Sequence, residues 1–124
     1  MKSNYDRYVA AFERNDYAEC LSCINYLVNK VPQNEKLKEG KVECLAKTGE
    51  TTDALTLLKT IRVGIDQSVP EFWYLKGIIE LYGGESSRAK KFFTEGMRLD
   101  PDHKKCRLAL NTAKKCELLK EEGN

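Results

Sequence analysis

The sequence predicts an all-α fold, an array of three helix hairpins followed by a C-terminal capping helix. Three observations predict it. Apolar residues recur with the three-and-four spacing of amphipathic helices, and no stretch alternates in the manner of a strand. Short polar or glycine-containing breaks separate the helical stretches. A common pattern also returns after 34 and then after 35 residues, a period typical of stacked helix hairpins.

The helical spacing predicts seven helices in chain order. Their expected ranges are 4–14, 17–30, 35–48, 52–63, 70–82, 86–98 and 102–121. The chain has three prolines, Pro32, Pro70 and Pro101, and each lies near an expected boundary. This placement favours helices between them, because a proline in a helix interior removes a hydrogen bond and clashes with the preceding turn.

The break inside each hairpin carries residues that end one helix and begin the next. Gly49 and Gly84 can take the left-handed conformation that closes a helix, and Asn15-Asp16 stands at the same place in the first hairpin. Side-chain oxygens just after the glycines are expected to accept hydrogen bonds from the free N–H groups of the next helix. The residues expected to do so are Thr51, Thr52, Ser86 and Ser87.

Small and large residues alternate at fixed positions of each second helix. The small residues are Cys20, Ala54 and Ala89, each five residues after the start of its turn. The large residues are Ile24, Leu58 and Phe93, each four residues later. We expect the small residues to be buried, because they let paired helices approach closely while the large residues fill the gap between neighbours.

The stretch from Pro70 to Pro101 resembles a tetratricopeptide repeat. The matching residues are Trp73, Gly77, Gly84, Ala89, Phe93, Gly96, Leu99 and Pro101. The two preceding stretches are similar at fewer positions, which are Tyr8, Ala11, Tyr17, Cys20, Leu27 and Pro32, then Val42, Leu45, Gly49, Ala54 and Leu58. The resemblance implies a right-handed superhelical array that forms one domain over residues 1–124, with repeats at about 1–34, 35–69 and 70–103 and a capping helix at 102–121.

The segment from Met97 to Cys106, continued by Ala113-Lys114-Lys115, is similar to a linker in tetratricopeptide co-chaperones that also carry a J-domain. This resemblance implies a protein–protein interaction module of a chaperone-assisting protein. Lys120, Gly123 and Asn124 have the spacing with which tail-binding repeats begin, so we expect a fragment of a longer protein. The alternative is a repeat scaffold or adaptor in an unrelated multiprotein complex, such as a transport or cell-cycle assembly.

In this family the first helix of each pair lines the concave face, which would bind polypeptide segments of client or chaperone proteins. The residues expected there are Tyr5, Val9, Phe12, Lys36, Glu39, Glu43, Tyr74, Ile78 and Leu81. Two apolar patches would flank a charged middle, a pattern that often marks interaction sites. The alternative, which the sequence leaves open, is that several of these residues pack between hairpins.

A clamp for acidic C-terminal tails is not expected in this segment. At the positions where the family uses asparagine, lysine or another basic residue, this chain has Tyr5, Val9, Gly40, Glu71 and Leu75. A carboxylate buried without hydrogen-bond donors is costly.

Composition excludes several other partners. The 21 Lys+Arg and 19 Asp+Glu residues are interspersed, which leaves no electrostatic footprint for nucleic acid or an anionic membrane. No apolar run approaches the roughly 20 residues needed to span a bilayer. Five cysteines, an odd count without framework spacing, indicate reduced thiols and therefore the cytoplasm, with the nucleus as second choice and the endoplasmic reticulum lumen disfavoured.

No residue pattern predicts an enzyme, a cofactor or a metal site. His103 is the one histidine, follows a predicted turn and is expected to face water without a catalytic partner. Cys20 and Cys23 have metal-like spacing, but a structural zinc site needs four ligands and no second closely spaced pair exists. We expect both thiols to pack in the core.

Overall fold

The computed structural model describes residues 3–122, which form seven α-helices and one 3₁₀ helix and contain no strand. The helices are α1 (Asn4–Glu13), α2 (Tyr17–Lys30), α3 (Glu35–Lys47), α4 (Thr51–Leu58), η1 (Arg62–Ile65), α5 (Pro70–Tyr82), α6 (Ser86–Leu99) and α7 (Lys104–Glu122). The all-helical prediction is confirmed. Gly123 and Asn124, which carry part of the predicted tail-binding spacing, lie outside the described residues.

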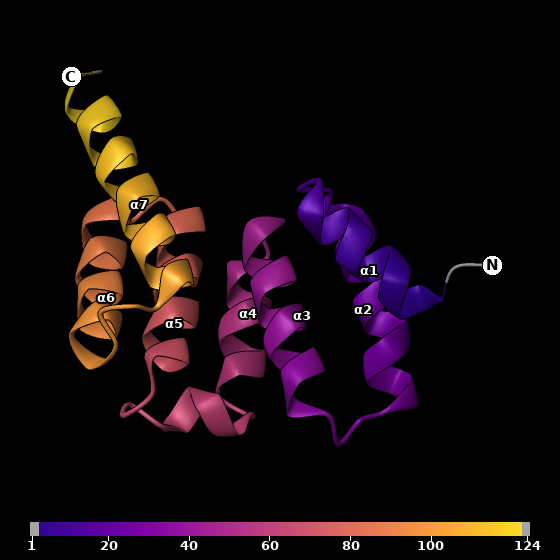
Figure 1. Ribbon diagram of the computed structural model, residues 1–124. Helices are drawn as coiled ribbons and strands as arrows, with labels where there is room; N and C mark the ends of the chain where they lie inside the picture. The colour runs from indigo at the N-terminus through magenta and orange to yellow at the C-terminus, as the bar shows by residue number, and fades with distance from the viewer. Residues whose placement is uncertain (1–2, 123–124) are drawn as a thin grey trace.

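Consecutive helices pair and the pairs stack side by side along the chain (Figure 1). The pairs are α1 with α2, α3 with α4, and α5 with α6, and α7 packs on α6 and α5. Helix α3 also contacts both α2 and α5, so it joins the first pair to the third. The proposed repeat boundaries within 1–124 stay a prediction.

The core agrees with the small-and-large alternation. The small residues Cys20, Ala54 and Ala89 are fully buried, and the large residues Ile24, Leu58 and Phe93 are buried beside them. Cys23 is buried as well, so the predicted core placement of the first two thiols is confirmed. In the part of the chain that the structure describes, all five cysteines are free and no three potential ligands gather around a common point.

The turns inside the hairpins have the predicted backbone, but the predicted caps are wrong. Asn15 has φ 60°, and Gly49 and Gly84 each have φ 88°, the left-handed region that closes a helix. The N-cap positions of α4 and α6 are taken by Glu50 and Glu85, and neither makes a side-chain capping bond.

The reason is the shortness of these turns. One residue after the left-handed glycine, the backbone N–H of Glu50 donates to Leu45 and that of Glu85 donates to Glu80, both at 2.9 Å. The helix therefore begins at the next residue. Thr51 and Ser86 already belong to it, and Thr52 and Ser87 follow inside the first turn.

The fourth helix is shorter than the sequence predicts. It ends at Leu58, and Ile61 follows in an extended conformation with φ −107° and ψ 158°. Gly64 then lies so close to the carbonyl of Leu58 that a side chain there would overlap it. The chain thus folds back on the end of α4, which buries Ile61 in the core. Continued helix over 59–63 would have lost this contact.

The capping helix is only half covered. Its apolar residues Cys106, Ala109 and Ala113 are buried against the preceding pair, whereas Leu118 and Leu119 near its end are exposed. The last turns of α7 extend past α5 and α6 in Figure 1. Across residues 3–122, every helix is too short or too polar to cross a membrane.

Candidate binding groove

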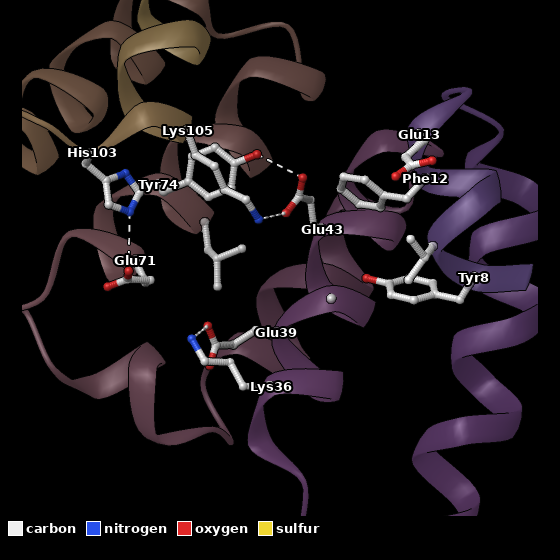
Figure 2. A pocket seen from close by; sticks show the side chains of 13 residues that line it. Tyr8, Phe12, Glu13, Lys36, Glu39, Glu43, Glu71, Tyr74, His103 and Lys105 are labelled. Carbon is white, nitrogen blue, oxygen red and sulfur yellow. Dashed lines mark hydrogen bonds and ion pairs between the residues drawn. The ribbon is translucent and has the colours of Figure 1, made fainter. Parts of the chain in front are cut away.

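A groove of about 570 Å³ runs across the face formed by α1, α3, α5 and the start of α7 (Figure 2). We call it the main groove. It is lined by Tyr8, Val9, Phe12, Glu13, Lys36, Glu39, Gly40, Glu43, Glu71, Tyr74, Leu75, His103 and Lys105. A second hollow of about 300 Å³, the side groove, continues toward α5 and α7. It shares Phe12, Glu43, Tyr74 and Lys105 with the main groove and adds Tyr17, Lys47, Ile78, Leu81, Tyr82, Leu108, Ala109 and Thr112.

A buried carboxylate stands where the two grooves meet. Glu43 of α3 is 3 % exposed and accepts a hydrogen bond from the Tyr74 hydroxyl at 2.8 Å. Lys47 Nζ lies 2.9 Å and Lys105 Nζ 3.4 Å from its oxygens. A buried charge needs this many partners, because its lost hydration is otherwise uncompensated. The cluster therefore ties α3 to both α5 and α7.

The cluster also shifts the ionisation of its members. Burial raises the pKa of Tyr74, and the charge of Glu43 adds to that, so the hydroxyl stays a hydrogen-bond donor. Burial by itself lowers the pKa of Lys47, but attraction and hydrogen bonding to Glu43 bring it above its ordinary value. Lys47 therefore remains an ammonium inside the groove.

Aromatic rings from α1 and α2 build one wall of the groove. Phe12 packs edge-on against Tyr8 and Tyr17, with ring centroids 6.0 and 5.8 Å apart. The ammonium groups of Lys47 and Lys105 lie 5.1 and 5.9 Å from the Phe12 centroid, within the range of cation–π attraction. This wall offers an apolar face whose edge already holds cations.

The opposite wall carries two carboxylates from neighbouring helices. Burial raises the pKa of Glu39 on α3; Lys36 opposes this shift, and the nearby charge of Glu71 on α5 adds to it. Lys36 lies 3.7 Å from Glu39, but its own side chain is 81 % exposed, so water screens the pair. Glu71 lies 3.3 Å from the Nε2 atom of His103.

His103 lines the groove, and the prediction that it faces water is wrong. Its side chain is only 12 % exposed. The Nδ1 atom accepts the backbone N–H of Cys106 at 3.2 Å, in the manner of a helix N-cap. In the neutral ring this bond assigns the proton to Nε2, which donates to Glu71. The histidine is held at this place because it caps α7.

Several solved structures match the helix arrangement of this chain over nearly its whole length. The first TPR domain of human RPAP3 covers 98 % of the chain, and 94 % of its own length is matched, with TM-score 0.63 and 16 % identity. This chain has the tetratricopeptide-repeat fold.

Two further tetratricopeptide-repeat (TPR) structures were solved with peptides. The second TPR domain of human RPAP3, in complex with the HSP70 peptide SGPTIEEVD, covers 90 % of the chain and 92 % of itself, with TM-score 0.60 and 20 % identity. The first TPR of Spaghetti (RPAP3), bound to the HSP90 peptide SRMEEVD, covers 93 % of the chain and 90 % of itself, with TM-score 0.61 and 15 % identity.

Curated relatives of the TPR domain are DnaJ-type proteins, as the sequence predicts. Human DnaJ homolog subfamily C member 7 is 29 % identical over 113 residues, which cover 91 % of this chain and 23 % of the relative. The Dictyostelium discoideum homolog is 28 % identical over 106 residues, which cover 83 % of this chain and 20 % of the relative. The chain thus spans about a quarter of the length of these relatives or less. No family model matches the chain.

The TPR domain brings together most of the predicted concave-face residues. Six of the nine line the main groove, namely Val9, Phe12, Lys36, Glu39, Glu43 and Tyr74. Ile78 and Leu81 line the side groove, whereas Tyr5 is 55 % exposed on α1 and lines neither. Glu43, Tyr74 and Ile78 are almost fully buried, so they support the groove from beneath more than they present a free surface.

Seven residues that line the main groove were not in the predicted set, namely Tyr8, Glu13, Gly40, Glu71, Leu75, His103 and Lys105. Tyr8 faces Gly40, which has no side chain and leaves room for the tyrosine hydroxyl. His103 and Lys105 enter from the start of the capping helix, which the sequence assigns to shielding the core alone. No local sequence signal marks His103 and Lys105 as groove residues, because their position depends on the packing of α7 on α5 and α6.

Proposed function

We propose that this TPR domain is a protein–protein interaction module of a chaperone-assisting protein and binds a polypeptide segment of a client or chaperone in the main groove. The observation that carries the proposal is the groove itself. It is open, joins four helices, and sets the aromatic wall opposite the carboxylates of Glu39 and Glu71, while the Glu43 cluster ties α3 to α5 and α7. The domain acts by binding and has no catalytic step.

The shape and lining of the grooves suit a chain rather than a compact ligand. Two hollows of about 570 and 300 Å³ meet at shared residues, so an extended or helical segment can place side chains in both. Aromatic and aliphatic anchors with a polar rim are typical of protein–protein contacts. Glu71 and Lys105 at the rim offer both charges for polar groups of the segment.

The chaperone context rests on similarity. The curated relatives are DnaJ homologs, and two structural neighbours were solved with HSP70 and HSP90 peptides. We further propose the cytoplasm as its compartment, which the odd number of five cysteines without framework spacing supports.

A direct test measures binding to a permanently unfolded polypeptide, reduced and carbamidomethylated lysozyme, by calorimetry. Phe12→Ala removes the central ring of the aromatic wall, and Val9→Ser removes a neighbouring apolar contact at little risk to the fold. Each is expected to weaken binding about fivefold or more, the loss typical of an interface anchor. Tyr26→Ala is the matched control, because Tyr26 is exposed on α2 and lines neither groove.

Equal binding by all four proteins, with helicity unchanged by circular dichroism, would refute the groove as the binding site. Binding of one folded partner but of no unfolded chain would favour the alternative function, an adaptor in an unrelated complex.

A further inference from the structure

The main groove carries an excess of negative charge. Four glutamates line it, Glu13, Glu39, Glu43 and Glu71, against two lysines, Lys36 and Lys105. The side groove differs: beyond the shared residues and Lys47, its added lining is aliphatic, aromatic or threonine. The face that we propose to bind polypeptide therefore has an acidic half and an apolar half.

Ion pairs within the protein compensate some of these carboxylates and leave others exposed to the groove. Lys105 and Lys47 both lie on Glu43, so that carboxylate is compensated within the protein. Among residues 3–122, Glu71 has one partner, the Nε2 atom of His103 at 3.3 Å, and its own side chain is 39 % exposed. Lys36 is exposed and contributes little to Glu39. Of the three other carboxylates, Glu13 lies exposed at the end of α1, whereas Glu39 and Glu71 lie together on the opposite wall with their charge facing the open groove.

These two carboxylates stand on adjacent helices and repel each other. Both line the main groove, and burial raises the pKa of Glu39, with the nearby charge of Glu71 adding to the rise. A cation placed between them would relieve the repulsion and make charge-assisted hydrogen bonds to both. A negatively charged side chain would instead be repelled by both carboxylates and would have no ammonium or guanidinium group to donate hydrogen bonds to them.

We propose that the groove selects a polypeptide segment carrying a lysine or arginine, whose cation binds between Glu39 and Glu71 while apolar side chains of the same segment enter the side groove. This specificity rests on the proposed function. It is the reverse of the charge in the acidic peptides SGPTIEEVD and SRMEEVD bound by the structural neighbours.

Lys105 separates the two halves and sets their order. Its ammonium lies 5.4 Å from the Tyr74 centroid and 5.9 Å from that of Phe12, between the main and side grooves. Beyond it, Leu108 and Tyr82 are 53 % and 43 % exposed beside Ile78 and Leu81. A bound segment must therefore have its cation on the main-groove side of Lys105 and its apolar residues on the side-groove side.

The test compares three versions of one short peptide with a leucine- and alanine-rich half. Its other half carries two lysines, two glutamines or two glutamates. Calorimetry at low salt should give the affinity order lysine, glutamine, glutamate, with about tenfold between the first and the last. In the double variant Glu39→Gln and Glu71→Gln, the three peptides should bind within about twofold of one another.

Two further variants control this comparison. Glu50→Gln with Glu85→Gln removes the same net charge from exposed turn residues outside both grooves, and should keep the original order. Leu108→Ser should weaken all three peptides alike, because it acts in the apolar half.

The outcomes separate this inference from the proposed function. If the glutamate peptide binds as tightly as the lysine peptide, while Phe12→Ala still weakens both, the charge selection is wrong and the binding groove stands. If Phe12→Ala and Leu108→Ser change no peptide's affinity, the groove is not the site and both proposals fail.

Discussion

At the residue scale, Glu43 is the point on which the groove depends. Its carboxylate is buried, yet it touches side chains from its own helix and from α5 and α7. The same group thus positions Tyr74, keeps Lys47 charged within the side groove and holds Lys105 at the rim. Replacement of such a residue should affect stability first, because its partners become buried polar groups without compensation.

Glu43→Ala is expected to lower the free energy of unfolding by about 3 kcal/mol, since it removes the carboxylate that compensates the Lys47 ammonium and accepts the hydrogen bond of the buried Tyr74 hydroxyl. Glu43→Gln keeps an acceptor for Tyr74 and should cost about half as much. Lys105→Ala, the control, removes a largely exposed partner and should cost under about 1 kcal/mol. Urea unfolding followed by circular dichroism measures all three. Equal losses for Glu43→Ala and Lys105→Ala would contradict the central role of Glu43.

His103 and Lys105 show why sequence alone did not complete the site. The nine predicted residues came from a repeat frame, and that frame places α1, α3 and α5 on the concave face. Nothing local to Asp102-His103-Lys104-Lys105 indicates that this turn comes back to the groove. That return depends on how α7 packs on α5 and α6, which is a tertiary contact.

At the element scale, periodicity and turn chemistry predicted nearly all helices to within a residue or two. The exception is the end of α4, where helical spacing continued through Ile61 but the structure ends the helix at Leu58. Leucine, threonine and isoleucine there fit a helix as well as a turn. Burial of Ile61 decided between them, and burial is not visible in a local pattern.

The α5–α6 pair illustrates how small residues set helix distance. Gly77 lies directly against the ring of Phe93, and Gly96 lies where an added Cβ would come within 2.6 Å of Cys106 Sγ. Both glycines are buried in helix interiors, where glycine weakens the helix. Their presence there is explained by the close approach that they permit.

Gly77→Ala is therefore expected to destabilise the protein, although alanine favours helices by about 1 kcal/mol. The new methyl group overlaps the Phe93 ring, and overpacking of this kind costs about 1–3 kcal/mol. Gly83→Ala is the comparison within the same hairpin, because its added Cβ meets no atom closer than 3.1 Å. Thermal unfolding should show a lower Tm for Gly77→Ala than for Gly83→Ala. The opposite order would argue that α5 and α6 are not held at this distance.

At the scale of the whole molecule, stability and binding share one element. Helix α7 covers the last apolar surface through Cys106, Ala109 and Ala113, and its first turn supplies Lys105 to the groove. Its last turns make few such contacts, and Leu118 and Leu119 are exposed. The two halves of one helix should therefore differ in what their removal does.

A chain ending at Asp102 lacks all of α7, so it exposes the apolar face of α5 and α6 and leaves Glu43 with one cation fewer. We expect it to lose several kcal/mol of unfolding free energy, on the order of 3–5 kcal/mol, because a repeat array needs its terminal cap. A chain ending at Glu117 keeps Cys106, Ala109 and the ion pair of Glu117 with Lys90, and should lose under about 1 kcal/mol. Urea titrations of both truncations against the full chain measure the difference. If both truncations lose the same amount, the covering role belongs to the exposed end of α7, and the link between cap and groove through Lys105 is wrong.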